Sequence, residues 1–120
     1  MINTRFIGRL GEQLVADYLQ KQGYKILCKN FRCKLGEIDL IAREGKDLVF
    51  VEVKSRSNYS YGLPQESVHQ KKQLKLRQVA AYFIQKNGCT DSRCRFDVVA
   101  VTFSKEPEQV ASIEIIKNAF

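Results

Sequence analysis

The sequence has few of the features that mark disordered, membrane-inserted or exported chains. Only two of its 120 residues are proline, and 44% are hydrophobic, which is enough to build one core. No stretch approaches the roughly 20 apolar residues that span a bilayer, and the first residues lack the apolar segment of a signal peptide. We therefore expect a single cytoplasmic domain over residues 1–120 with no membrane partner.

The cysteine content, four of 120 residues, is below that of a disulfide-rich scaffold. The four cysteines form two C-x4-C pairs, Cys28 with Cys33 and Cys89 with Cys94. Cysteines of a cytoplasmic protein are usually reduced and partly buried, so no disulfide is expected. Four thiolates could hold a structural zinc ion, but the spacing is wider than that of zinc knuckles. Cys28 alternates with Tyr24 and Ile26 as a core strand residue would, and we favour that reading over zinc.

Acidic residues are outnumbered, with 13 Asp and Glu against 20 Lys and Arg and a net charge of +7. The excess is local, because residues 21–34 hold five basic residues and no acid, and residues 65–88 hold five against Glu66. A solvated basic face explains many such runs. The charge therefore favours a nucleic-acid partner only in combination with a chemical site.

Hydrophobic periodicity predicts the order αβββαββ. Apolar residues at helical spacing indicate one helix over about residues 4–22 and a second that ends near Gly88. Alternating segments bounded by turn residues indicate five strands, at about residues 24–30, 36–43, 48–55, 95–103 and 110–116. This order predicts an α/β domain of three layers, with a mixed central sheet flanked by helices.

Charged residues interrupt two of the expected strands. If their hairpin is symmetric about the turn Gly45-Lys46, the numbers of opposed residues sum to 91, so Asp39 faces Glu52 and Glu37 faces Lys54. Two carboxylates in a partly buried strand pair destabilise each other unless a proton or a cation lies between them. A divalent metal ion would supply that cation.

Lys54 lies two residues after Glu52, so both side chains share one face of the strand. Carboxylates that bind a metal ion, with an adjacent ammonium group, suit phosphodiester hydrolysis. The alternative is that Glu52 and Lys54 form the solvent-facing half of an edge strand whose valines pack inward. Leu48 and Phe50 share the face of Glu52 and argue against that alternative, because they place the acid at a boundary.

Asp39 and Glu52-Val53-Lys54 resemble the D...ExK core of the restriction-endonuclease-like, or PD-(D/E)XK, nuclease superfamily. A pattern along the whole chain is more specific: Gly11-Glu12, Gly36-Glu37-Ile38-Asp39-Leu40-Ile41-Ala42, Val49 to Lys54, Gly62, Pro64, Lys72 and Arg95-Phe96-Asp97-Val98. It resembles the YraN-like family of bacterial proteins over essentially all 120 residues. That family is similar to archaeal Holliday-junction resolvases, whose helix glutamate, strand aspartate and ExK motif match Glu12, Asp39, Glu52 and Lys54.

The resemblance implies a restriction-endonuclease-like fold and a catalytic site. Asp39 and Glu52 would bind Mg²⁺ or Mn²⁺, together with the Val53 carbonyl, and Lys54 would assist the attacking water. Glu12 would join the site, because the neighbouring Gly11 permits a close approach to the sheet, although helix glutamates are ordinarily solvated.

Residues around this core are candidates for nucleic-acid binding. Lys72 matches the family pattern and could contact a phosphate, as could the nearby Lys71 and Lys75, whereas the alternative for each is an ordinary surface lysine. Arg56 and Tyr61 follow the ExK motif, where Tyr61 could stack on a base or pack against the protein. Arg95 and Asp97 are expected to form a structural pair.

The sequence thus predicts a metal-dependent endonuclease that hydrolyses phosphodiester bonds in DNA, with branched or flapped DNA as candidate substrates. The alternative is a nucleic-acid-binding module with the same fold and little or no catalysis. A scaffold protein with an incidental basic surface is a third reading. A homodimer is expected, since relatives that cut two strands symmetrically act as dimers.

Overall fold

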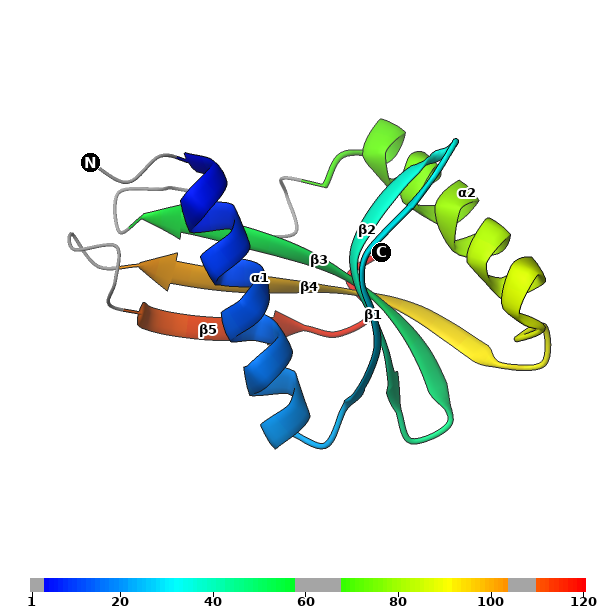
Figure 1. Cartoon of the computed structure of the whole chain (residues 1–120), viewed down its shortest axis with the longest axis horizontal. Helices are drawn as coiled ribbons and strands as arrows, with labels where there is room; N and C mark the ends of the chain where they lie inside the picture. The colour runs from blue at the N-terminus through cyan, green and yellow to red at the C-terminus, as the bar shows by residue number, and fades with distance from the viewer. Residues whose placement is uncertain (1–3, 58–67, 104–109) are drawn as a thin grey trace.

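The computed structural model describes residues 4–57, 68–103 and 110–120, which form two helices and five strands (Figure 1). In chain order these elements are α1 (Thr4–Lys21), β1 (Lys25–Cys33), β2 (Gly36–Glu44), β3 (Asp47–Ser57), α2 (Gln70–Asn87), β4 (Arg93–Phe103) and β5 (Val110–Ile116). The predicted order αβββαββ is confirmed. Within these ranges, neither helix is long and apolar enough to cross a membrane.

The five strands form one mixed sheet in the order β1-β2-β3-β4-β5. Neighbouring strands are antiparallel except for β3 and β4, which are parallel and are connected through α2. Glu44 pairs with Asp47 across a two-residue turn, and Leu40 pairs with Val51 further along the hairpin. The predicted hairpin register is therefore confirmed over the part of the two strands that pairs.

The sheet carries a hydrophobic cluster on each face, because alternate residues of β3 point to opposite sides. Val49 and Val51 pack in the cluster that contains Val15 and Leu19 of α1. Their neighbours on β3 pack in the cluster of α2, which includes Leu48, Phe50, Leu76, Val79, Ala80 and Phe83. The two helices thus cover opposite faces, and the structure is an α/β fold of three layers.

Strand β2 leaves β3 beyond Leu40. From Ile38 to Gly36 its pairing continues with β1 alone among the described strands, and Figure 1 shows the β1–β2 arm curving away from β3 alongside α2. The expected pairing of Glu37 with Lys54 is therefore wrong. Glu37 forms an exposed ion pair with Arg32 instead, with 2.9 Å between Oε2 and Nε.

Helix α2 has a defined cap at each end. His69 Nδ1 accepts a hydrogen bond from the Lys72 backbone N–H at 3.4 Å and serves as the N-cap. Gly88 ends the helix with a φ of 67°, a left-handed conformation that glycine adopts without a steric penalty. The His69 cap fixes the first turn of α2, which carries Lys71 and Lys72.

The four cysteines are free thiols. Cys28 is half-buried, but a register shift between Ile26 and Cys28 places it in the α2-side cluster while Ile26 packs on the α1 side. The expected alternation of Cys28 with Tyr24 and Ile26 is therefore wrong, because an irregularity in β1 reverses the side-chain direction. Among the described residues, no three His, Cys, Asp or Glu side chains are grouped so that they could hold a metal ion.

Candidate functional site

Asp39 and Glu52 lie side by side where β2 separates from β3. Asp39 Oδ2 accepts a hydrogen bond of 2.8 Å from the Val53 backbone N–H, in place of the strand partner that β2 no longer provides. The Glu52 carboxylate is close enough to accept a hydrogen bond from a protonated Asp39. Burial, reinforced by Glu52, raises the pKa of Asp39 to about 8, so this carboxyl group retains a proton near neutral pH.

Two lysines adjoin the carboxyl pair. Lys72 Nζ lies 3.2 Å from Glu52 Oε2, and only 10% of the Glu52 side chain is exposed. Burial and the neighbouring Lys72 lower the pKa of Lys54. Burial is the largest influence on Lys72 and acts to lower its pKa, but Glu52, Lys54 and Asp39 together outweigh burial, and the pKa is raised. The negative charge of the carboxyl pair is thus offset by a proton on Asp39 and by the Lys72 ammonium group at Glu52.

A second acid pair in the same hairpin, Glu44 and Asp47, is neutralised by an arginine. Glu44 and Asp47 face each other at the turn, and Arg95 binds both, with 2.9 Å between its Nη1 and Asp47 Oδ2. A planar guanidinium group suits such bridging. Asp39 and Glu52 have no arginine among their described ion-pair partners. The charge of this pair is offset by a proton and by the partly exposed Lys72 in place of a guanidinium group.

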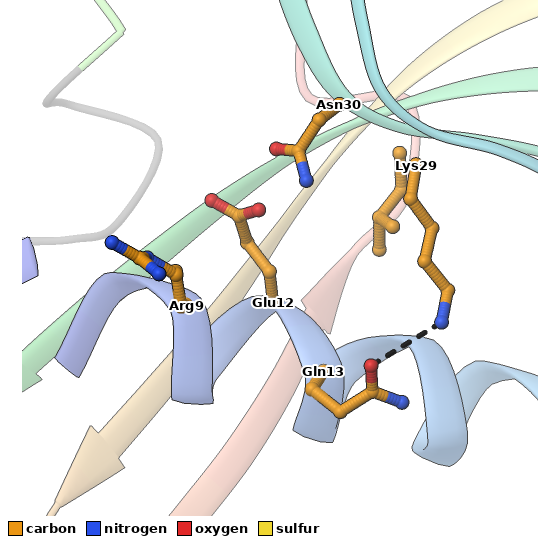
Figure 2. Close-up of a pocket in the computed structure, with 6 residues that line it drawn as sticks. Arg9, Glu12, Gln13, Lys29 and Asn30 are labelled. Carbon is orange, nitrogen blue, oxygen red and sulfur yellow. Dashed lines mark hydrogen bonds between the residues drawn. The ribbon is translucent and has the colours of Figure 1, made fainter. Parts of the chain in front are cut away.

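Glu12 approaches the pair from α1. It lines a pocket of about 200 Å³ between α1 and β1, and Figure 2 shows its carboxylate directed toward the Asn30 amide. Burial raises the pKa of Glu12, while a hydrogen bond from Asn30 acts in the opposite direction. The charge of Glu12 helps to raise the pKa of Asp39. Glu12 flanks the pair without completing a group of three metal-binding side chains among the described residues.

Apart from Leu40, the rest of the pocket wall is polar and basic. Lys29 donates a hydrogen bond of 3.3 Å to Gln13, and Arg9 lies beside Glu12 (Figure 2). Asn30 has a φ of 53° and sits between the β1 residues that pair with Leu40 and Ile38 of β2. Asparagine tolerates this left-handed conformation better than most residues. The backbone at Asn30 therefore turns its amide to Glu12.

Gly11 sets how closely α1 lies on the sheet. A Cβ atom at this position would lie 2.0 Å from Ser55 Oγ and 3.3 Å from Ser55 Cβ on β3. The expectation that Gly11 permits a close approach is confirmed, and this contact brings the adjacent Glu12 to the site. Ser55 Oγ is buried and has no hydrogen-bond partner in the described part of the chain.

The donor set fits a hard divalent cation. Asp39 and Glu52 supply carboxylate oxygens, and the Val53 carbonyl faces the same side of β3 as the N–H that Asp39 binds. Oxygen ligands suit Mg²⁺ and Mn²⁺, and Mg²⁺ usually keeps several waters, so it needs few protein ligands. Asp39, Glu52 and the Val53 carbonyl could therefore hold such an ion.

The remaining residues predicted to bind nucleic acid differ in their exposure to solvent. Lys71 and Lys75 are exposed on α2, and Lys72 and Lys75 line a hollow of about 230 Å³ between α2 and the start of β2. Arg56 is half-buried, with 3.5 Å between its Nε and Thr102 Oγ1. Tyr61 lies outside the described residues.

Arg95 and Asp97 form the structural pair expected from the sequence, with 3.0 Å between Nε and Oδ1 and only 1% of Asp97 exposed. Two features of the site escape sequence reasoning. One is the contact of Lys72 with Glu52, which joins residues 20 positions apart. The other is the role of Asn30, for which the only sequence signal is an asparagine within a strand.

Comparison with known proteins assigns the chain to a family. The model of the family described as "Uncharacterised protein family UPF0102" matches residues 11–101. A UPF0102 protein of Caldicellulosiruptor bescii is 51% identical over 99% of this chain and 100% of its own length. One from Moorella thermoacetica is 49% identical over 94% and 93%, respectively, and one from Geobacter metallireducens is 44% identical over 99% and 95%. The chain therefore belongs to the UPF0102, or YraN-like, family.

Proposed function

We propose that this protein is a metal-dependent endonuclease with a restriction-endonuclease-like fold that hydrolyses phosphodiester bonds in DNA, using Mg²⁺ or Mn²⁺. Branched or flapped DNA is the proposed substrate class. One observation carries the proposal: two adjacent carboxyl groups, Asp39 and Glu52, share a half-buried site beside Lys54, and the ion pair described for them is with a lysine, Lys72. The resemblance of Asp39 and Glu52-Val53-Lys54 to a D...ExK core adds support.

Each residue has a role that its surroundings can sustain. The Val53 N–H holds the Asp39 carboxylate in place, so that Asp39 and Glu52 present their oxygens together. A divalent ion bound there would polarise the scissile phosphate and acidify a water molecule. Lys54, whose pKa is lowered by burial and by Lys72, is suited to orient the attacking water by donating a hydrogen bond. Glu12, next to the pair, is suited to accept a hydrogen bond from that water.

The test is a cleavage panel of single-stranded, duplex, flapped and four-way DNA with Mg²⁺ or Mn²⁺. We expect metal-dependent cleavage of at least one branched substrate, and its loss with EDTA. Glu52→Gln controls for contaminating nucleases, because it removes one charge at nearly constant volume. Cleavage that persists unchanged in Glu52→Gln would contradict the proposal.

A nucleic-acid-binding module is the second candidate. The observation in its favour is the ion pair of Lys72 with Glu52, which satisfies one carboxylate without a metal ion. Such a module would bind DNA with a salt-dependent affinity, weakened by Lys71→Ala with Lys72→Ala, and would cleave nothing. The cleavage panel separates the two candidates. Sedimentation on the bound substrate tests the proposed homodimer, since symmetric cutting of two strands requires two sites.

A further inference from the structure

We propose that Lys72 is an exchangeable counter-ion of the Asp39–Glu52 pair: a divalent cation displaces its ammonium group from Glu52, and the released lysine then turns to a phosphate of the nucleic acid. This inference rests on the proposed function and deepens it. It makes Lys72 a positioning residue that couples occupation of the metal site to binding of the substrate.

The geometry of the ion pair favours exchange. Glu52 is nearly buried, with 10% of its side chain exposed, whereas 36% of the Lys72 side chain is exposed. The lysine can therefore swing into solvent while the carboxylate stays in place. Lysine holds its partner through a single compact ammonium group on a flexible stem, unlike the forked contact that Arg95 makes with Glu44 and Asp47.

Electrostatics supplies the driving force. Lys54 and Lys72 are close enough to perturb each other, and two neighbouring ammonium groups are tolerated because carboxylates lie beside them. A divalent ion on Asp39 and Glu52 would replace the proton of Asp39 and neutralise both carboxylates, which adds positive charge beside the two ammonium groups. Repulsion then expels one lysine, and we assign this role to Lys72, because its ammonium group contacts Glu52 directly and 36% of its side chain is exposed.

The surroundings provide a place for the released side chain. The Lys72 backbone is fixed by its hydrogen bond to the His69 cap, so only the four-carbon stem needs to move. Lys71 and Lys75 are exposed on the same part of α2, and Lys75 shares a hollow with Lys72, where the acidic lining residue Glu37 is paired with Arg32. A displaced Lys72 would therefore join a basic row that suits a phosphate backbone.

The experiment measures Mn²⁺ affinity by calorimetry in Lys72→Met, with Lys75→Met as the control for a general loss of positive charge. If Lys72 competes with the metal ion, Lys72→Met binds Mn²⁺ about fivefold more tightly than Lys75→Met, a factor typical of removing a partly exposed ion pair. Lys72→Arg should bind Mn²⁺ more weakly than wild type, because a forked guanidinium group is harder to displace. Without metal, Lys72→Met should melt a few degrees below Lys75→Met, and saturating Mn²⁺ should abolish that difference.

The outcomes separate this inference from the proposed function. Equal or weaker Mn²⁺ binding by Lys72→Met than by Lys75→Met, with normal binding by wild type, would overturn the exchange and leave the metal site intact. If Lys72→Met fails to fold, Lys72→Arg decides alone, and Mn²⁺ binding at wild-type strength overturns the exchange. Wild-type binding that Glu52→Gln does not weaken would overturn the proposed function itself.

Discussion

The Asp39 carboxylate accepts a hydrogen bond of 2.8 Å from the backbone N–H of Val53, across the point where the two strands of their hairpin separate. The Asp39 side chain thus supplies the hydrogen-bond acceptor that the backbone of a neighbouring strand would otherwise provide to Val53. The bond fixes Asp39 beside Glu52 and acts against the rise in its pKa that burial causes. Most of the behaviour expected of the site follows from this arrangement.

The first prediction concerns the pH dependence of metal-free stability. The pKa of Asp39 is raised from its usual 3.8 to about 8 in the folded protein. Below pH 4 both states are protonated, whereas between about pH 4 and 8 only the folded state keeps the proton, so stability falls as pH rises. Asp39→Asn mimics the protonated group. In EDTA, wild type should therefore lose stability relative to Asp39→Asn across this range, by about 1.4 kcal/mol per unit of pKa shift at most.

Urea denaturation at several pH values measures the difference in the free energy of unfolding between wild type and Asp39→Asn. Taking this difference cancels the contributions of the titrating groups that the two proteins share. A constant difference between pH 4 and 8 would show that Asp39 titrates normally and that its carboxyl group is not confined against Glu52.

The second prediction concerns the packing of α1. Gly11→Ala should destabilise the protein by about 1–3 kcal/mol, because the new Cβ atom meets Ser55 Oγ at 2.0 Å and Ser55 Cβ at 3.3 Å. Ser55→Ala removes a buried hydroxyl group that has no partner in the described ranges and should cost little alone. In the double variant, Ser55→Ala should recover part of the loss, as a thermal-melt double-mutant cycle would measure. Purely additive effects would mean that the two residues do not touch.

Asn30 is expected to matter through its side chain as well as its backbone. Asn30→Gly keeps the left-handed backbone but removes the amide that bonds to Glu12, so cleavage should fall about tenfold. Asn118→Gly is a matched control, since Asn118 also has a φ of 53°. Its cleavage rate should stay near wild type. Equal rates in the two variants would limit Asn30 to a backbone role.

Arg95 should dominate stability at the other end of the hairpin. Arg95→Met leaves Asp97, which is 1% exposed, without its cation and should cost about 3–5 kcal/mol. Arg93 also contacts Asp47, but 81% of its side chain is exposed. Arg93→Met should therefore lower the free energy of unfolding by less than about 1 kcal/mol. Chemical denaturation of the two variants provides the comparison. A similar small loss in both would show that Asp97 finds another partner.

The hairpin was readable from the sequence because its turn residues fix the register. Symmetry about Gly45-Lys46 predicts that Leu40 pairs with Val51, as the structure has it. The same reasoning fails at Glu37, since a local rule cannot foresee that β2 leaves β3. The departure depends on the β1–β2 arm packing alongside α2, which is a tertiary effect.

Contacts between segments that are distant in the sequence could likewise not be predicted from it. The pairing of Arg95 with Asp97 can be predicted, because the two residues lie on one face of the same strand. The other two partners of Arg95, Glu44 and Asp47, lie at the β2–β3 turn, far away in the sequence. The contact of Lys72 with Glu52 requires knowing how α2 returns over β3. Sequence spacing gives the residue types of the site, whereas the chain fold decides which charges meet.

The central claim, that Asp39 and Glu52 form a metal site, is tested most directly by the melting temperature of wild type and Glu52→Gln in increasing MnCl₂. A cation that binds only the folded protein should raise the wild-type melting temperature progressively with concentration. In Glu52→Gln the rise should largely disappear, and DNA cleavage should fall by about 100-fold or more. Equal metal-induced stabilisation of both proteins would contradict the account and move any metal site away from Glu52.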